Sequence, residues 1–172
     1  LHLVNIWAAD QRMVIGQQLA PDRSEVKGVL QALSCLSLDG CIVTADALHC
    51  RADTASAILK TGADYALALK GNQPGLLNRA IALLEKESNP DRAEKADGKA
   101  HDRTETRRAV IVKAEGMDFP GVKAIARLES IRVEPDGRQT RHIRHFLLSR
   151  SVSATAFLDI ARAHWTIENQ LH

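Results

Sequence analysis

The segment CIVTADAL at residues 41–48 decides the class of fold, because an unbroken apolar strand ends directly at an aspartate, Asp46. A continuous apolar run of this length is typical of a strand that is covered on both faces. A second such run, YALAL at residues 65–69, leads into Lys70. Two strands of this kind, joined through a helix, predict a parallel pair, and ligand sites form beyond the carboxyl ends of such strands.

The residues before this segment predict a hairpin followed by a helix. LHLVNIWA at residues 1–8 and RMVIGQQL at residues 12–19 are two apolar runs joined by a short polar link, as in a β-hairpin. Ser24 then has the character of an N-cap, and apolar residues recur at helical spacing over residues 25–36.

The residues after Asp46 continue an alternation of helix and strand. A helix around residues 54–60 ends at Gly62, a favourable C-terminal position for glycine, and Pro74 begins a further helix. The first ninety residues therefore read β-β-α-β-α-β-α. This order predicts an α/β layer fold with a mixed sheet, antiparallel at the first hairpin and parallel after it.

The second half of the chain is predicted to be richer in strands. Residues 88–100 are polar, and they are expected to form a loop. Residues 106–113 and 140–149 are expected to be strands, whereas residues 122–133 fit either a strand or a helix. Ser153 is expected to cap a final helix.

Composition limits the class of protein. The 172 residues are 45% hydrophobic and 26% charged, an ordinary globular mixture for one domain, or for one domain with an insert. Three cysteines without metal-ligand spacing argue against a disulfide scaffold or zinc finger and favour a reducing cytosol. No apolar run reaches the roughly 18 residues of a membrane span. Because the chain starts at Leu1 and stops at His172 inside a predicted helix, we expect a piece of a longer protein.

Charge is distributed unevenly along the chain. Residues 1–100 hold 11 Lys and Arg against 12 Asp and Glu, whereas residues 101–172 hold 12 against 9. Residues 138–150 contain four arginines, two histidines and no acidic residue. This pattern permits nucleic-acid binding but also describes a solvated strand face. His142 and His145 would lie on opposite faces of a strand, beside arginines, so we expect no zinc site there.

Three places in the sequence are candidates for chemistry. Asp46 offers a carboxylate at the end of a rigid strand, although a turn or helix-cap aspartate is an equal alternative for that position alone. Glu168 lies on the predicted C-terminal helix beside apolar neighbours, where a glutamate is either functional or simply at the surface. Lys70 and Asn72, in LKGNQ, offer donors to a phosphate, and the alternative is an ordinary strand-to-helix turn.

Taken in order, the motifs resemble those of the DDE transposases of bacterial insertion sequences, and more closely those of the H-repeat-associated subgroup. The matching segments run along nearly the whole chain: LHLVNIWA, Gly16-Gln17, IVTADAL, GADYALALKGNQ at residues 62–73, H-x-R-x-E-x-R at residues 101–107, and R-x-HW-x-IENQLH at residues 162–172.

The resemblance implies an RNase H-like fold: a mixed sheet with flanking helices and a β-rich insertion before a C-terminal catalytic helix. The corresponding ranges are 1–98 for the core, 99–150 for the insertion and 151–172 for the helix. The resemblance also implies a site of two aspartates and one glutamate. Asp46 matches the second aspartate and Glu168 the glutamate, whereas the first aspartate is expected upstream of the position of Leu1.

The implied activity is the cutting and joining of double-stranded DNA at insertion-sequence ends and a target, in a bacterial cytoplasm. Two Mg²⁺ or Mn²⁺ ions bound by carboxylates suit this chemistry. The residues expected to hold DNA phosphates are Lys70, Asn72, Arg138 and Arg144. The two arginines are expected to act together, because they lie six positions apart on a predicted strand and so share one face. A homodimer is expected of the full-length transposase, and no membrane is expected as a partner.

The sequence also departs from the family pattern. Ala161 and His164 stand where the related signature has tyrosine and arginine, and Asp102 stands where the subgroup has glycine. Without the first aspartate, the isolated chain is expected to be inactive. Two alternatives follow: a truncated remnant that folds or binds DNA without catalysis, and an RNase H-like nuclease that acts on RNA–DNA hybrids.

Overall fold

The computed structural model describes residues 2–100 and 103–170, except for the side chains of residues 97–100, 103 and 166–170. Its elements follow the predicted order through the first ninety residues and then continue with four strands and a long helix. They are β1 (Leu3–Ala8), β2 (Met13–Leu19), the 3₁₀ turn η1 (Pro21–Arg23), α1 (Glu25–Ser34), β3 (Ile42–Ala45), α2 (Ala52–Lys60), β4 (Asp64–Leu69), α3 (Pro74–Lys86), β5 (Asp91–Ala100), β6 (Arg103–Lys113), β7 (Ala124–Val133), β8 (Gln139–Leu148) and α4 (Ala154–Gln170).

The first hairpin forms a sheet of its own. Strands β1 and β2 pair antiparallel as predicted, but in the described part of the chain they do not join the other strands. The expectation of one sheet that includes this hairpin is therefore wrong. The hairpin packs instead on α1, where Gly28 allows a close approach: a Cβ atom there would lie 2.8 Å from Cγ2 of Val4.

The other six strands form one mixed sheet in the order β3-β4-β8-β7-β6-β5. Strands β3 and β4 are parallel, as predicted, and every other neighbouring pair is antiparallel. The ambiguous segment at residues 122–133 resolves as β7, whose residues are buried on both faces over its first half.

The expectation of a loop at residues 88–100 is wrong, because β5 occupies most of that range. Its sequence is polar because β5 is the edge strand of the sheet, where charged side chains are favoured. The strand is held by its pairing with β6, and a salt bridge of 2.6 Å between Glu94 and Arg108 links the two strands.

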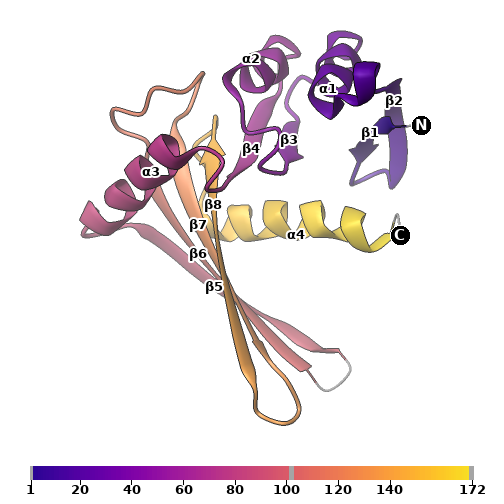
Figure 1. Cartoon of the computed structure of the whole chain (residues 1–172). Helices are drawn as coiled ribbons and strands as arrows, with labels where there is room; N and C mark the ends of the chain where they lie inside the picture. The colour runs from indigo at the N-terminus through magenta and orange to yellow at the C-terminus, as the bar shows by residue number, and fades with distance from the viewer. Residues whose placement is uncertain (1, 101–102, 171–172) are drawn as a thin grey trace.

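Helices cover both faces of the six-stranded sheet (Figure 1). Helices α2 and α3 pack on one face, and α1 packs beside α2; the three helices share a core that includes Leu33, Ile58 and Leu84. Helix α4 packs on the other face, which is rich in small side chains. These small side chains let the backbone of α4 approach the sheet, and they are Ala66, Ala68, Ala109, Ala124 and Ala126.

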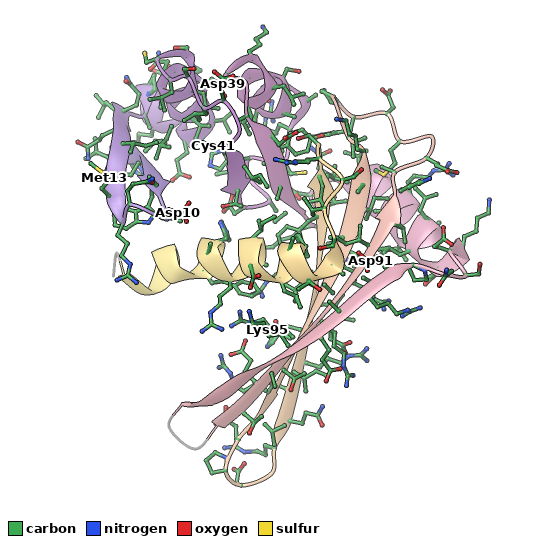
Figure 2. The ribbon with its side chains drawn as sticks, turned by 180° about the vertical axis from the view of Figure 1, so that it is seen from behind. Asp10, Met13, Asp39, Cys41, Asp91 and Lys95 are labelled. Atoms are coloured by element: carbon green, nitrogen blue, oxygen red, sulfur yellow. The ribbon has the colours of Figure 1, made fainter. Side chains whose placement is uncertain are left out.

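The start of α4 is fixed to the edge strand β5. The Ser153 hydroxyl accepts a hydrogen bond from the backbone N–H of Ala156 at 3.2 Å, so this residue is the predicted N-cap. The Asp91 carboxylate accepts a second bond from the N–H of Ala154 at 2.7 Å. Lys95 lies farther along β5 (Figure 2), and its ammonium group donates to the Asp159 carboxylate at 2.8 Å. Carboxylates at a helix N-terminus also interact favourably with the helix dipole.

A mixed β-sheet between helices is the RNase H-like α/β fold class that the sequence predicts. Beyond the covered part of the sheet, the strands β5 to β8 continue as two long hairpins that project past α4 (Figure 1). Among the described residues, no helix has the length and apolarity that a membrane crossing requires.

Candidate functional site

Asp46 lies directly after β3, in an exposed turn. Its Oδ1 accepts a hydrogen bond from the backbone N–H of Leu48 at 3.0 Å, and its backbone carbonyl accepts one from His49 at 3.1 Å. Oδ2 makes no hydrogen bond within the described residues. The carboxylate is therefore oriented by its own turn and retains one oxygen for a ligand.

The segment after β4 holds this turn in place. The side-chain amide of Asn72 donates to the carbonyl of Ala47 at 2.8 Å, and that of Gln73 donates to the carbonyl of Cys50 at 3.1 Å. Lys70 is exposed at the end of β4, beside the end of the parallel strand β3. The LKGNQ motif thus joins the loops that follow two neighbouring strands.

Cys50 is fully buried in the same loop, and burial raises the pKa of its thiol to about 11. A thiol with such a pKa stays protonated near neutral pH. Since the thiolate is the nucleophilic form, Cys50 has a packing role here.

The side chains of Thr44 and His164 connect β3 to α4. Oγ1 of Thr44 lies 2.9 Å from Nδ1 of His164, in a partly buried position. Ile42, two residues earlier on the same strand, also packs against the core beneath α4. The face of β3 that carries these two residues is therefore the face covered by α4.

Glu168 belongs to the last part of α4, and its side chain lies outside the described residues. His101 and Asp102 lie outside them as well. Among the described residues, no group of three or more His, Cys, Asp or Glu side chains is arranged to hold a metal ion. That Asp46 and Glu168 belong to one metal site thus remains a prediction.

Arg138 and Arg144, the two arginines expected to share one face of the last hairpin, lie in different surroundings. Arg138 precedes β8 by one residue, and its guanidinium forms a salt bridge of 2.6 Å with Asp136 in the turn. Arg144 lies within β8, and its guanidinium carbon is 4.6 Å from the centroid of the Trp165 ring. Arg141 pairs with Glu129 on the opposite face, as strand alternation requires.

A cavity of about 300 Å³, which no local sequence pattern indicates, lies where Arg144 meets α4. Trp165 of α4 forms one of its walls. The others come from alternate residues on three neighbouring strands, and they are Glu105, Arg107, Ser130, Arg132, His142 and Arg144. Each strand contributes two residues that lie two positions apart, and this spacing predicts that the two share a face. Only the strand order and register bring the residues of the three strands together.

Comparisons with known proteins agree with this architecture. The family model described as "Transposase DDE domain" matches residues 1–172. The chain is 32% identical to the "H repeat-associated putative transposase YhhI" of Escherichia coli (strain K12), a match that covers 100% of this chain and 49% of that protein. It is 33% identical to the "Putative transposase YncI" of Escherichia coli O157:H7, over 100% of this chain and 47% of that protein.

A third relative, "Putative protein YbfL" of Escherichia coli (strain K12), is 32% identical over 100% of this chain and 49% of that protein. The chain thus spans about half the length of these curated relatives. No solved structure matches it. The chain belongs to the family of transposases with a DDE domain, and within it to the H-repeat-associated subgroup.

Proposed function

We propose that this chain forms the catalytic core of a transposase that cuts and joins DNA at insertion-sequence ends, with Asp46 and Glu168 as two metal-binding carboxylates. The observation that carries this proposal is the contact between Thr44 and His164. Thr44 belongs to the strand that leads into Asp46, and His164 belongs to the helix that leads into Glu168.

The periods of strand and helix extend this contact to the two acidic residues. Alternation on β3 places Ile42 and Thr44 on the α4 side, and position 46 follows by one further period of two. On α4, position 168 follows His164 by four residues and Trp165 by three, which is about one turn of helix. Position 168 is therefore expected on the face of α4 that lies between positions 164 and 165, on the side of Asp46.

The chemistry of Asp46 suits a divalent metal ion. An exposed carboxylate with an unpaired oxygen, held at the end of a rigid strand, is the hard oxygen ligand that Mg²⁺ and Mn²⁺ prefer. Two such ions, when bound, would activate an attacking water or DNA 3′-hydroxyl and stabilise the leaving oxygen. In this proposal Asn72 fixes the Asp46 turn through Ala47.

We assign Lys70 to the DNA phosphate nearest the metal ions. Ala66 and Ala68 of β4 face α4, and position 70 continues that alternation beside Asp46. In a full-length transposase that carries this segment, Lys70→Ala should therefore lower the rate of DNA cleavage more than it weakens DNA binding. Arg138, at the tip of a projecting hairpin, is assigned to more distant DNA backbone, and Arg138→Ala should weaken the binding of all sequences alike.

Iron-mediated cleavage of the polypeptide tests the metal site without any need for DNA chemistry. The 172-residue protein is loaded with Fe²⁺ in place of Mg²⁺ and treated with ascorbate and peroxide, which cut the backbone beside the bound ion. We expect a cut near residue 46 that is lost in both Asp46→Asn and Glu168→Gln. Asp53→Asn is the matched control, because Asp53 is a half-exposed carboxylate paired with Arg51 nearby. A cut that survives both site substitutions would contradict the assignment.

The 172-residue protein by itself is expected not to cut DNA, because two carboxylates without a third bind two divalent ions weakly. Nicking of a supercoiled plasmid in Mn²⁺ measures this. Nicking by the purified protein that Asp46→Ala abolishes would mean that another acidic residue of this chain completes the site.

A further inference from the structure

We propose that the cavity between α4 and strands β6 to β8 binds a backbone phosphate of DNA through Arg107, Arg132 and Arg144, and that Trp165 connects this phosphate to the turn of α4 that carries Glu168. This inference rests on the proposed function for the identity of the ligand. The cavity itself is defined by the described side chains alone.

The strand register gathers the arginines on one face. Arg107 on β6 pairs with Ser130 on β7, which in turn pairs with His142 on β8. Arg132 lies one period of two beyond Ser130, and Arg144 lies one period of two beyond His142, so all of these residues share a face. Ala109 and Phe146, which continue the same alternation, pack beneath α4. The arginines therefore stand at the point where the covered part of the sheet ends.

The cavity carries more positive than negative charge. Glu105 is the one carboxylate among its described lining residues, at 3.0 Å from Nε of Arg107 and at 3.8 Å from Nη2 of Arg132. Arg144 has no carboxylate partner among the described residues. Among the described side chains that line the cavity, three guanidinium groups stand against one carboxylate, so arginine charge exceeds carboxylate charge there. An anion that binds here would relieve the repulsion between these groups and accept charge-assisted hydrogen bonds.

Trp165 concentrates this charge. The guanidinium carbons of Arg107 and Arg144 lie 5.2 and 4.6 Å from the centroid of its ring, each within cation–π distance. These two distances limit the separation of the cations to less than about 10 Å, which is one Debye length at about 0.1 M salt. The two cations therefore repel each other across the site and jointly attract an anion. Arginine is also the residue best shaped to bind phosphate oxygens in pairs.

Ser130 provides an independent sign that the cavity takes a ligand. Its hydroxyl oxygen is buried, yet it has no hydrogen-bond partner within the described residues. Buried polar groups are almost always paired, so an unpaired hydroxyl in a cavity wall marks a position for an external oxygen or a water molecule. A phosphate oxygen would provide that partner.

The position of Trp165 gives the cavity a consequence for catalysis. Trp165 precedes Glu168 by three residues, about one turn of α4. A phosphate that fixes Arg107 and Arg144 also fixes the indole between them, and with it the turn that leads to Glu168. DNA bound at the cavity would therefore help to place a metal ligand, so Trp165 acts as a positioning residue.

Fluorescence of Trp165 tests the phosphate site directly. The chain has two tryptophans, so the Trp7→Phe variant leaves Trp165 as its one indole. We expect a 30-base-pair duplex to change the emission of this variant in a saturable manner. Arg144→Gln and Arg132→Gln, each added to it, should weaken binding about tenfold or more and reduce the salt slope by about 0.9. The matched control is Arg108→Gln, on the opposite face of β6 beside Glu94, which should weaken binding less than about threefold.

Hydrogen exchange tests the connection to Glu168. DNA should slow amide exchange in residues 160–170 of the parent chain and of Arg108→Gln, but not of Arg144→Gln or Trp165→Leu. Equal slowing in all four proteins would overturn the positioning role of Trp165. Loss of DNA binding in Trp165→Leu would overturn it too, because Trp165 would then be needed to bind the phosphate and not only to position Glu168.

Inorganic phosphate separates the two sources of the ligand. Competition between millimolar phosphate and the duplex for the same emission change supports a site for a DNA phosphate. A response to phosphate without any response to DNA would overturn the assignment to DNA, and no response to either would overturn the cavity as an anion site. A tryptophan response together with failed iron cleavage would reject the proposed metal site while the phosphate site stands.

Discussion

The hydroxyl of Thr44 and the imidazole of His164 lie 2.9 Å apart although 120 positions separate them in the sequence. This polar contact joins the shortest strand of the six-stranded sheet to the longest helix. Because the contact is partly buried, both groups would lose a partner if α4 shifted away from β3. The relative position of β3 and α4, on which the proposed metal site depends, is therefore specified by identifiable side chains.

Removal of either partner of this contact should destabilise the protein. We expect Thr44→Val and His164→Phe each to lower the free energy of unfolding by about 1 kcal/mol, the usual net value of a hydrogen bond. Urea denaturation measures the change, and Thr155→Val, at an exposed position of α4, serves as the control. The double variant should lose less than the sum of the single losses, and strict additivity would show that the two side chains do not interact.

Gly62 should tolerate no larger residue. Its φ angle is +84°, and a Cβ atom there would lie 1.8 Å from Oδ1 of Asp39. Gly62→Ala should therefore cost at least about 1–2 kcal/mol of stability from the backbone conformation alone. Gly71→Ala is the matched control, because no atom lies within 4 Å of the Cβ position there. Thermal unfolding midpoints compare the two variants, and equal midpoints would contradict the strain at Gly62.

The three cysteines should differ in reactivity. Cys35 and Cys41 are exposed and should react with a thiol reagent in the folded protein at pH 8, whereas Cys50 should react only after unfolding. Rapid modification of all three thiols under native conditions would contradict the buried position of Cys50. Counting modified thiols by mass spectrometry distinguishes the outcomes.

Cys50 should also contribute to loss of stability in alkaline solution. Its folded pKa of about 11 lies above the ordinary value of 9.0, because burial disfavours the thiolate. A group whose pKa is raised on folding stabilises the protein fully below the unfolded pKa, and this contribution is lost as the pH rises through the folded pKa. Between pH 9 and 11 the free energy of unfolding should therefore fall more steeply in the parent protein than in Cys50→Ala. Parallel curves in urea denaturation would contradict this origin.

Asp91 should stabilise the first turn of α4 from a distant strand. Asp91→Ala removes the carboxylate that accepts the N–H of Ala154, which should cost about 1 kcal/mol, as loss of a helix cap does. Asp10→Ala is the control, since Asp10 is exposed in the turn between β1 and β2 (Figure 2). Loss of helical circular dichroism at a lower urea concentration measures the effect, and equal midpoints for both variants would contradict it.

Local patterns were sufficient to predict most of the elements. The apolar runs at residues 41–45 and 65–69 are the strands β3 and β4, and Ser24 and Ser153 cap the helices that they were predicted to cap. Strand β5 was missed because an edge strand needs little apolar surface, so its residues carry no periodic signal. Its stability comes from long-range pairing with β6 and from contacts with α4, such as the one between Lys95 and Asp159.

The site was predictable only in part, for a related physical reason. Asp46 stands out because it follows a buried strand directly, a signal that is local in the sequence. The cavity beside Trp165 gives no such signal, because its charged residues come from three strands and its aromatic wall comes from a helix. The spacing of two between Glu105 and Arg107 indicates a shared face, but the register that adds Arg132 and Arg144 depends on the whole sheet.

The small residues beneath α4 have a consequence for the protein during its synthesis. A ribosome adds about 5–20 residues per second, so His164 is made about 6–24 s after Thr44. Strands β4 to β8 are made during that interval, and until α4 follows them the alanine-rich face that they form has no helix to cover it and remains open to chaperones and to other nascent chains. Completion of α4 closes that face and brings His164 to Thr44 in the same step, so an interrupted translation product would lack the proposed metal site however well its earlier strands had folded.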